Sequence, residues 1–251
     1  MKGDRKPATI GQLHAVLHSA FEEALRWNLI ARNPVAAVRA PKVERVEMKI
    51  LTLPEIHRFL HAIEGDALEA LYVLAVTTGA RQGELLALRW QDVDLEAGKV
   101  AINATLTRID GKWIRSNPKT AGSVRTVTLS QRAFTALKAH RLRMAEELLP
   151  LRQRTEGETL VFLVNGQPVN GFHVTERRLK PMLRAASLPG IRFHDLRHVF
   201  ASLMLSNGTR PDLVAQMLGH SNPATTLRIY AHLMPGDQQS AMARLDEVLA
   251  G

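Results

Sequence analysis

The sequence predicts a mainly helical α+β protein, that is, a mainly α fold with a small antiparallel β-sheet. Over most of the chain, apolar residues recur three or four positions apart, which is the period of an amphipathic helix. Between residues 98 and 129 the pattern changes to the alternation of half-buried strands, as in Val100 and Ile102. A second alternating run includes Val124, Thr126 and Thr128, and Asp110-Gly111 is a strong turn signal between the two runs. We therefore expect one small sheet here, with helices before and after it.

Residues 1–45 are expected to form a separate piece. A helical stripe of apolar residues runs over residues 9–27, but its own segment offers almost nothing to bury it against. Pro34 and Pro41 then mark a linker. We interpret this piece as the last helix of a helical domain whose earlier part the chain lacks, and we expect a second domain over residues 46–251.

The second domain begins with clear helix signals. Thr52 and Glu55 have the spacing of a capping box, which satisfies free N–H groups at the start of a helix. A long apolar helix is expected over about residues 67–77, and Gly79 ends it. A further helix is expected over about residues 82–88, and the chain is again helical beyond the sheet.

Composition limits the classes of function. The 251 residues include no cysteine, which excludes disulfides, thiolate metal sites and cysteine nucleophiles and suits a reducing cytosol. No apolar run approaches the roughly 18 residues of a membrane span. The formal net charge is +9, which favours a polyanionic partner, with nucleic acid ahead of a membrane surface. We expect a cytoplasmic protein that binds no membrane.

The first candidate site residue is Arg81, in the stretch Thr77-Thr-Gly-Ala-Arg-Gln-Gly-Glu84. It falls between the end of one expected helix and the start of another, where a guanidinium and free backbone N–H groups can bind a phosphate together. Glu84 lies on the same helix face and could hold Arg81 in place. Considered alone, the pair could equally be a surface ion pair.

The second candidate stretch is Arg192-Phe-His-Asp-Leu-Arg-His198. His194 and Arg197 are three residues apart and share one face near a helix start. Two cations side by side repel each other, so the pairing makes sense when an anion lies between them. A solvated basic face is the alternative, and His198 is expected to be a packed or capping histidine.

The third stretch, from Leu218 to His232, contains His220 and Tyr230. Gly219 suits the end of one helix, and Ser221 suits the N-cap of the next. The chain has two tyrosines, and the other one, Tyr72, lies in an apolar run typical of a core. Tyr230 has polar neighbours in sequence, although in isolation it could be an ordinary half-buried helix tyrosine.

Together these stretches can converge on one phosphodiester. A phenol with its usual pKa of roughly 10 is a poor nucleophile at neutral pH. Surrounding positive charge would favour the phenolate of Tyr230 and stabilise charge on the phosphoryl oxygens. A proton donor is then needed for the leaving oxygen, and Lys119 lies in an expected turn between strands, although alone it could be an exposed loop lysine.

With these residues in place, the sequence resembles the tyrosine recombinase family, also called the phage integrase family. The resemblance runs from about residue 50 to the C-terminus. Its motifs follow the family's order and are TGARQGELLALRW, PKTAGSVRTV, HDLRH, LGHS and TTLRIYAH.

The resemblance implies a tyrosine recombinase catalytic-domain fold and a role for each site residue. Tyr230 would attack the scissile phosphate to give a 3′-phosphotyrosyl enzyme. The other five implied catalytic residues are Arg81 and Arg197 as phosphate clamps, His194 as general base, Lys119 as general acid and His220 as a hydrogen-bond donor. The implied activity is site-specific DNA recombination or integration, as in mobile elements, without a cofactor or a metal ion.

The resemblance also implies partners. The chain would act on double-stranded DNA as a homo-tetramer and would be a monomer or weak oligomer without DNA. An apolar stripe that includes Met242, Leu245 and Leu249 would suit docking on a neighbouring subunit or folding back in cis. Because family members usually place a full helical core-binding domain before the catalytic domain, we expect this chain alone to bind DNA weakly, with steep salt dependence.

Three alternatives remain at this stage. A non-catalytic DNA-binding fragment would form no covalent adduct. A type IB topoisomerase-like enzyme would share the nicking and closing chemistry without strand exchange. A metal-dependent nuclease built from His194, Asp195 and His220 would lose its activity in EDTA, but the sequence offers no clustered carboxylates for a two-metal site. The target site, and the choice among integration, excision and resolution, are beyond the sequence.

Overall fold

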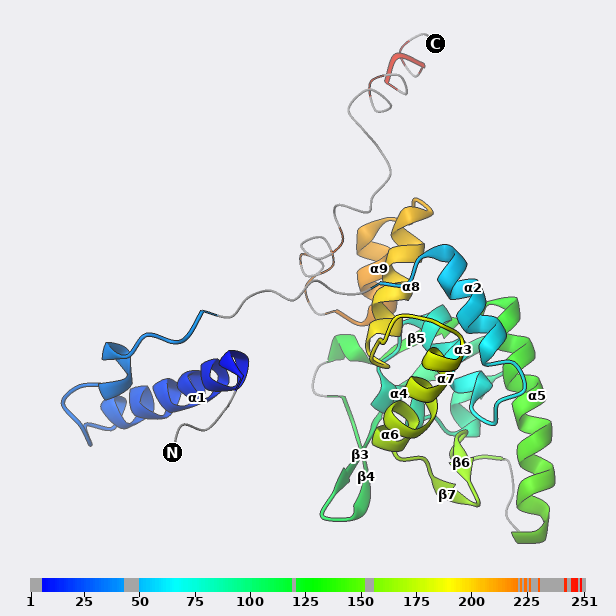
Figure 1. Ribbon diagram of the computed structural model, residues 1–251, viewed down its shortest axis with the longest axis horizontal. Coiled ribbons are helices and arrows are strands. Elements are labelled where there is room, and N and C mark those ends of the chain that lie inside the picture. The colour runs from blue at the N-terminus through cyan, green and yellow to red at the C-terminus, as the bar shows by residue number, and fades with distance from the viewer. Residues whose placement is uncertain are drawn as a thin grey trace. The chain divides into compact units, whose positions relative to one another are not determined.

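The computed structural model describes residues 6–42, 50–118, 121–151 and 156–220, and also residues 222, 224, 226, 230, 242, 245–247 and 249. The chain divides into two compact units, Met1–Met48 and Lys49–Gly251 (Figure 1). Within the described residues, no helix combines the length and the apolar character needed to cross a membrane.

The first unit contains helix α1 (Pro7–Arg26) and the short 3-10 helix η1 (Pro34–Ala37). The Asn33 side chain joins them, because it accepts a hydrogen bond from the Val35 N–H at 2.9 Å and donates one to Glu22 of α1 at 2.7 Å. The residues of α1 are all described and none is buried, and its apolar residues Ile10, Leu13, Val16 and Leu17 are exposed.

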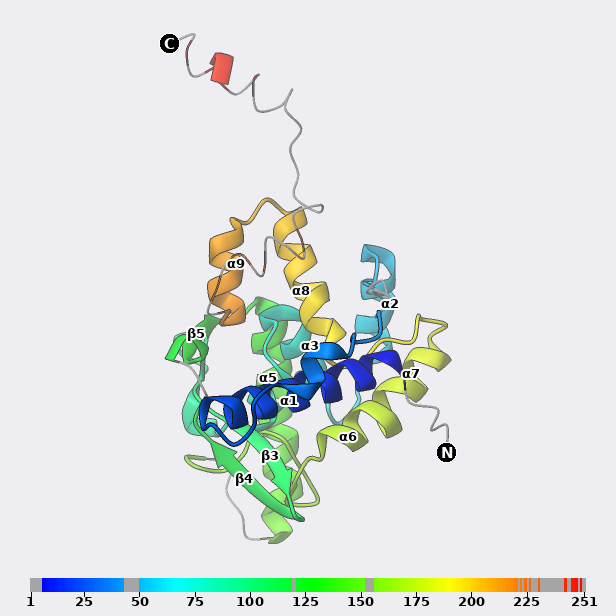
Figure 2. The same cartoon turned by 90° about the vertical axis from the view of Figure 1, so that its left-hand side faces the viewer.

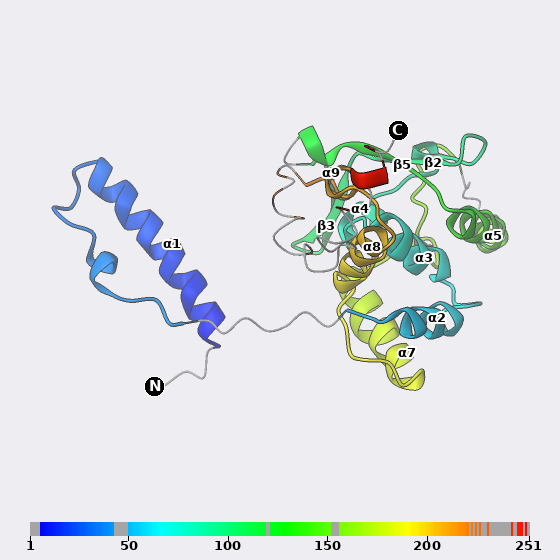
Figure 3. The ribbon, with the colours of Figure 1, turned by 90° about the horizontal axis from the view of Figure 1, so that it is seen from above.

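The second unit is mostly helical. The helices with described bounds, in chain order, are α2 (Leu53–Ala62), α3 (Glu69–Thr78), α4 (Gln82–Leu86), η2 (Trp90–Asp92), η3 (Ala121–Ser123), α5 (Gln131–Leu148), η4 (Leu149–Leu151), α6 (Gly171–His173), the π-helical turn η5 (Val174–Leu179), α7 (Lys180–Ala185), α8 (Asp195–Ser206) and α9 (Pro211–Leu218). Figure 3 shows α2 and α7 side by side, and the two helices are in contact.

Seven short strands accompany these helices in the described part of the chain. They are β1 (Val93–Asp94), β2 (Lys99–Ile102), β3 (Thr105–Ile109), β4 (Lys112–Ser116), β5 (Arg125–Thr128), β6 (Leu163–Val164) and β7 (Gln167–Pro168). The order β1-β2-β5 forms an antiparallel sheet in which Val100 pairs with Val127, and both side chains are buried. The prediction of a mainly α fold with a small antiparallel sheet is confirmed.

The sheet region differs from the expectation in one respect. Asp110-Gly111 does form a turn, but it joins β3 to β4 in a separate two-stranded ribbon, and β5 pairs with β2 instead. Asp110 and Gly111 have φ of 48° and 78°, as a tight hairpin requires. A local turn signal identifies the hairpin, whereas the pairing of β2 with β5 depends on packing between segments that are distant in sequence.

Helix α3 is the centre of the core. Every residue from Ala70 to Val76 is buried, and α5 and α8 pack against it (Figures 1 and 2). Gly79 ends this helix with φ of 62°, and a Cβ atom there would lie 2.5 Å from Phe200 and 2.6 Å from Leu218. Glycine is therefore needed for both the backbone conformation and the space. This turn leads directly to Arg81.

Candidate active site

Arg81 is placed by the start of α4. It is the N-cap residue of this helix, and its backbone N–H donates to Glu84 Oε2 at 2.9 Å. The Arg81 guanidinium also donates to Glu84 Oε1 at 2.7 Å. Glu84 is buried, whereas the Arg81 side chain is 43% exposed. Arg81 is therefore anchored at one end of its guanidinium and accessible to a ligand.

Arg125, at the start of β5, is a second cation on the same carboxylate. Its side chain is 6% exposed and donates to Glu84 Oε2 at 2.9 Å and to the Met217 carbonyl at 2.7 Å. Burial raises the pKa of Glu84, but the hydrogen bond and charge of Arg125, followed by Arg81, hold it below its usual value. Sequence reasoning missed this contact, because Arg125 and Glu84 are 41 residues apart.

Arg197 is buried in the first turns of α8, on the core side. Its Nη1 atom donates to the Gly79 carbonyl at 2.7 Å, which links α8 to the turn before Arg81. Its Nη2 atom is buried and has no hydrogen-bond partner in the described part of the chain. Burial, and then the charge of Arg81, lowers the Arg197 pKa to about 10. A buried N–H without an acceptor is costly, and a phosphate oxygen would satisfy it.

Two histidines lie one helical turn apart beside Arg197. His194 is the N-cap residue of α8 and is exposed, and the ring of His198 meets it edge to face with centroids 5.2 Å apart. Partial desolvation, followed by the Arg197 charge, lowers the pKa of His194. Asp195, between them, is held by Arg192 at 2.8 Å. The carboxylate that a metal-dependent nuclease would need is therefore engaged in an ion pair with Arg192.

His220 follows α9 directly. The helix ends at Gly219, whose φ is 68°, and His220 Nδ1 then hydrogen-bonds to the buried hydroxyl of Thr226 at 2.8 Å. Burial, and then the charges of Arg197 and Arg81, lowers the His220 pKa to about 4. The imidazole is therefore neutral at neutral pH, and it can donate one N–H without adding a charge.

Tyr230 is 2% exposed and belongs to an apolar cluster. The cluster partners are Phe200, Ala201, Leu205, Val214 and Leu218. Burial raises the Tyr230 pKa to about 12, although the Arg197 charge opposes this. The Arg197 charge thus favours the phenolate, as expected, but in this structure desolvation outweighs it.

The Tyr230 hydroxyl is hydrogen-bonded to Nδ1 of His198. This contact joins the tyrosine to α8. His198 is half-buried, in keeping with the expectation of a packed histidine, and it also contacts the predicted nucleophile. The sequence carries a signal for this contact only in retrospect, because His198 lies one helical turn after His194 on the same helix face.

The structure thus brings together five of the six predicted site residues. The charges of Arg81 and Arg197 lower the pKa of both His194 and His220, and the charge of Arg197 also acts on the pKa of Tyr230. The sixth, Lys119, and the cap residue Ser221 lie outside the described residues.

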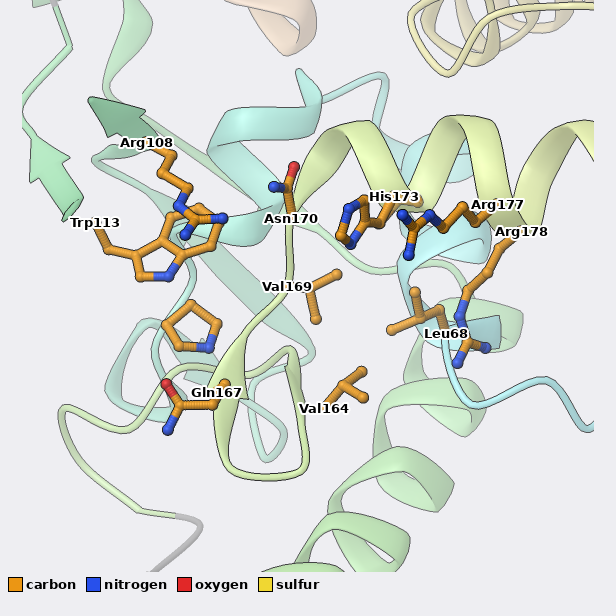
Figure 4. Close-up of a pocket in the computed structure, with 12 residues that line it drawn as sticks. Leu68, Arg108, Trp113, Val164, Gln167, Val169, Asn170, His173, Arg177 and Arg178 are labelled. Atoms are coloured by element: carbon orange, nitrogen blue, oxygen red, sulfur yellow. The ribbon is translucent and has the colours of Figure 1, made fainter. Parts of the chain in front are cut away.

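A separate basic pocket of about 480 Å³ lies between the β3–β4 ribbon and α6 with η5 (Figure 4). Arg108 stacks over Trp113 at 5.5 Å on one side, and His173, Arg177 and Arg178 line the other side. None of the described site residues lines this pocket. It adds positive charge to the second unit outside the candidate active site.

The chain is similar to known proteins over most of its length. The model of the Phage integrase family matches residues 49–236. The chain is 28% identical to the ICEBs1 integrase of Bacillus subtilis (strain 168) and 32% identical to a "Tyrosine recombinase XerC-like" protein of Caldanaerobacter subterraneus subsp. tengcongensis. Each alignment covers 96% of this chain but 66% of the relative, so the chain spans a little under two thirds of their length.

Solved structures show the same fold. The Tn1549 transposon integrase in complex with transposon right end DNA has a TM-score of 0.80 at 22% identity, covering 98% of this chain and 81% of that one. A lambda integrase dimer bound to a COC′ core site has a TM-score of 0.60 at 25% identity, covering 88% and 74%. On the family match and the shared fold, this chain belongs to the phage integrase family, whose members include tyrosine recombinases.

Proposed function

We propose that this chain is a site-specific DNA recombinase that cuts and rejoins DNA strands through a 3′-phosphotyrosyl intermediate on Tyr230. The observation that carries the proposal is the convergence of Arg81, Arg197, His220 and Tyr230, with one buried N–H of Arg197 that has no acceptor among the described residues. Such a set of donors suits one phosphodiester, because two guanidiniums and a neutral imidazole can donate hydrogen bonds to its oxygens.

Each residue has a proposed role in the cleavage step. Tyr230 attacks phosphorus while Arg81 and Arg197 hold the non-bridging oxygens. His220 donates a hydrogen bond to the phosphate, and Thr226 fixes its ring. The family resemblance implies His194 as the general base and Lys119 as the general acid for the leaving 5′ oxygen. Attack by a 5′ hydroxyl reverses the step, so rejoining needs no nucleotide cofactor.

We assign the chemistry to the second unit, Lys49–Gly251, and interpret the first unit as part of a DNA-clamping domain. The chain would work in the cytoplasm on double-stranded DNA. On DNA it would form a homo-tetramer, and without DNA a monomer or weak oligomer. The side chains of Met242, Leu245 and Leu249 are 50%, 46% and 72% exposed, which leaves them available for contact with a neighbouring subunit.

A covalent-trapping experiment tests this proposal. The probe is a pool of nicked DNA duplexes with random sequence on both sides of the nick, so that a short 5′-hydroxyl fragment diffuses away after cleavage. The protein is incubated with the pool in EDTA, and covalently attached DNA is recovered under denaturing conditions, with Tyr230→Phe in parallel. Wild-type protein should retain DNA and Tyr230→Phe should not.

Other results would contradict the proposal. Attachment that persists in Tyr230→Phe would exclude this nucleophile, and no attachment by the wild type would favour a non-catalytic DNA-binding fragment. Cleavage that EDTA abolishes would favour a metal-dependent nuclease. If recovered sites support relaxation of a supercoiled plasmid but no exchange between two duplexes, the activity is topoisomerase-like.

A further inference from the structure

The nearest polar group to the proposed nucleophile belongs to His198. The Tyr230 hydroxyl and His198 Nδ1 are hydrogen-bonded, and the ring centroids are 5.8 Å apart. Tyr230 is buried and His198 is half-buried, so the bond is largely shielded from water. Among the described residues, His198 is the hydrogen-bond partner of this hydroxyl.

The family resemblance implies His194 as the general base. In this structure the ring of His194 contacts the ring of His198, which is the one hydrogen-bonded to Tyr230. The two histidine rings meet edge to face, and no hydrogen bond joins His194 to Tyr230 in the described part of the chain. A general base must be within hydrogen-bond reach of the proton that it removes, directly or through one water. In this structure His198 meets that requirement directly.

The protonation state of His198 suits a base. Burial, and then the charge of His194, lowers the His198 pKa, so the ring is neutral at neutral pH and Nδ1 can offer a lone pair. Asp195 acts in the opposite direction and would stabilise the imidazolium once it forms. The titratable or charged groups that face His198 are Arg192, His194, Asp195, Arg197, His220 and Tyr230.

We propose that His198 is a catalytic residue that accepts the phenolic proton of Tyr230 as the tyrosine attacks DNA. This inference rests on the proposed role of Tyr230. In the cleavage step the Oη–H bond breaks and its proton moves to Nδ1, Oη bonds to phosphorus, and the bond from phosphorus to the 5′ oxygen breaks. The leaving oxygen takes a proton from the general acid, the role proposed for Lys119. In rejoining, each proton returns to its donor.

The test compares single-turnover cleavage rates on a nicked duplex recovered from the random pool. The variants are His198→Ala, His198→Gln and His194→Ala, with the exposed His61→Ala as a matched control. Glutamine keeps a hydrogen-bond acceptor near the tyrosine but cannot take up a proton, so it separates positioning from proton transfer. DNA affinity and the midpoint of thermal unfolding are measured for every variant.

We expect His198→Ala and His198→Gln to slow cleavage by about 10²-fold or more, the usual contribution of a general base. Their DNA affinity and folding should match the wild type, and His61→Ala should cut normally. Imidazole added to His198→Ala should restore part of the rate. The wild-type rate should fall as the pH drops below 6.5, the usual pKa of histidine, and His198→Gln should lose that acidic limb.

Several outcomes would overturn this assignment. If His198→Ala cuts at the wild-type rate, the hydrogen bond between His198 and Tyr230 is incidental to catalysis. If it cuts faster, that bond restrains the tyrosine in its resting position. Recovery of the rate in His198→Gln, or an unchanged acidic limb, would reduce His198 to a positioning residue. If His194→Ala loses cleavage while the His198 variants cut normally, the general base is His194. Failure of the proposed function would be seen separately in the covalent-trapping experiment. There the wild-type protein would form no adduct that depends on Tyr230.

Discussion

Glu84 lies between two guanidinium groups, Arg81 three residues before it and Arg125 41 residues after it. The second of these also holds the Met217 carbonyl near the end of α9, two residues before Gly219 and three before His220. Arg125 therefore ties the arginine at the start of α4 to the segment that carries His220. A buried carboxylate with this pairing fixes the geometry of the site and also makes it sensitive to loss of either partner.

Replacement of Arg125 tests this arrangement. Arg125→Met should lower the free energy of unfolding by about 3 kcal/mol, because Glu84 remains buried with one partner lost. Cleavage should fall as well, since Arg81 and His220 lose a common anchor. Urea unfolding measures the first effect. The control is Arg132→Met, whose ion pair with Glu64 is exposed on both sides and should contribute roughly 0–1 kcal/mol. Equal effects of the two substitutions would contradict the role of Arg125.

The low pKa of His220 predicts that the stability of the protein depends on pH. The His220 pKa of about 4 in the folded protein is below the usual 6.5, so the unfolded chain binds more protons between these values. The contribution to stability is complete above about pH 6.5 and is lost as the pH falls toward 4. Wild-type stability should therefore decline over this window, and His220→Gln should decline less steeply in urea titrations at each pH. Parallel curves for the two proteins would exclude this source of pH dependence.

At the level of elements, the turn between α3 and α4 organises the phosphate-binding groups. Gly79 ends α3, its carbonyl accepts the bond from Arg197, and Arg81 follows two residues later. Helix α8 thus meets the turn from one side while α4 leaves it on the other. Both proposed arginine clamps depend on the conformation of one short loop.

A pair of glycine substitutions isolates the packing at this turn. Gly79 and Gly98 both have φ of 62°, but a Cβ at Gly98 meets no atom within 4 Å, whereas at Gly79 it clashes with Phe200 and Leu218. Gly98→Ala should cost about 1–2 kcal/mol from backbone strain alone. Gly79→Ala should cost about 1–3 kcal/mol more from overpacking, and it should also reduce cleavage. Equal costs in chemical denaturation would show that the turn tolerates a side chain.

Local signals in the sequence predict much of this framework. The capping box at Thr52, the glycine that ends α3 and the turn at Asp110-Gly111 each depend on neighbouring residues, and all three are present in the structure. The pairing of β2 with β5 could not be predicted in the same way, because a hairpin is inserted between these strands.

The site shows the same division between local and distant effects. The motifs predict which residues gather, and Arg81, Arg197, His220 and Tyr230 do lie near one another. Their partners come from distant segments, since His198 reaches Tyr230 across 32 positions. The burial of Tyr230 likewise depends on α8 and α9 packing around it, which no run of adjacent residues encodes.

For the whole molecule, the net charge of +9 should dominate binding to DNA of arbitrary sequence. Each phosphate that the protein neutralises should add roughly −0.9 to the slope of log affinity against log salt. We expect weak binding to a random duplex with a steep slope, measured by fluorescence anisotropy over a salt series. Nanomolar binding to one site that salt does not weaken would contradict this expectation.

The most direct test of the account is to identify the amino acid joined to DNA. The trapped adduct is digested with nuclease and trypsin, and the modified peptide is sequenced by mass spectrometry. The chain has two tyrosines, and Tyr72 is fully buried in the core, where burial raises its pKa far above the usual value. We predict a nucleotide joined through its 3′ phosphate to the Tyr230 hydroxyl. A modification on Tyr72 or any other residue, or no covalent link from wild-type protein, would contradict the central claim.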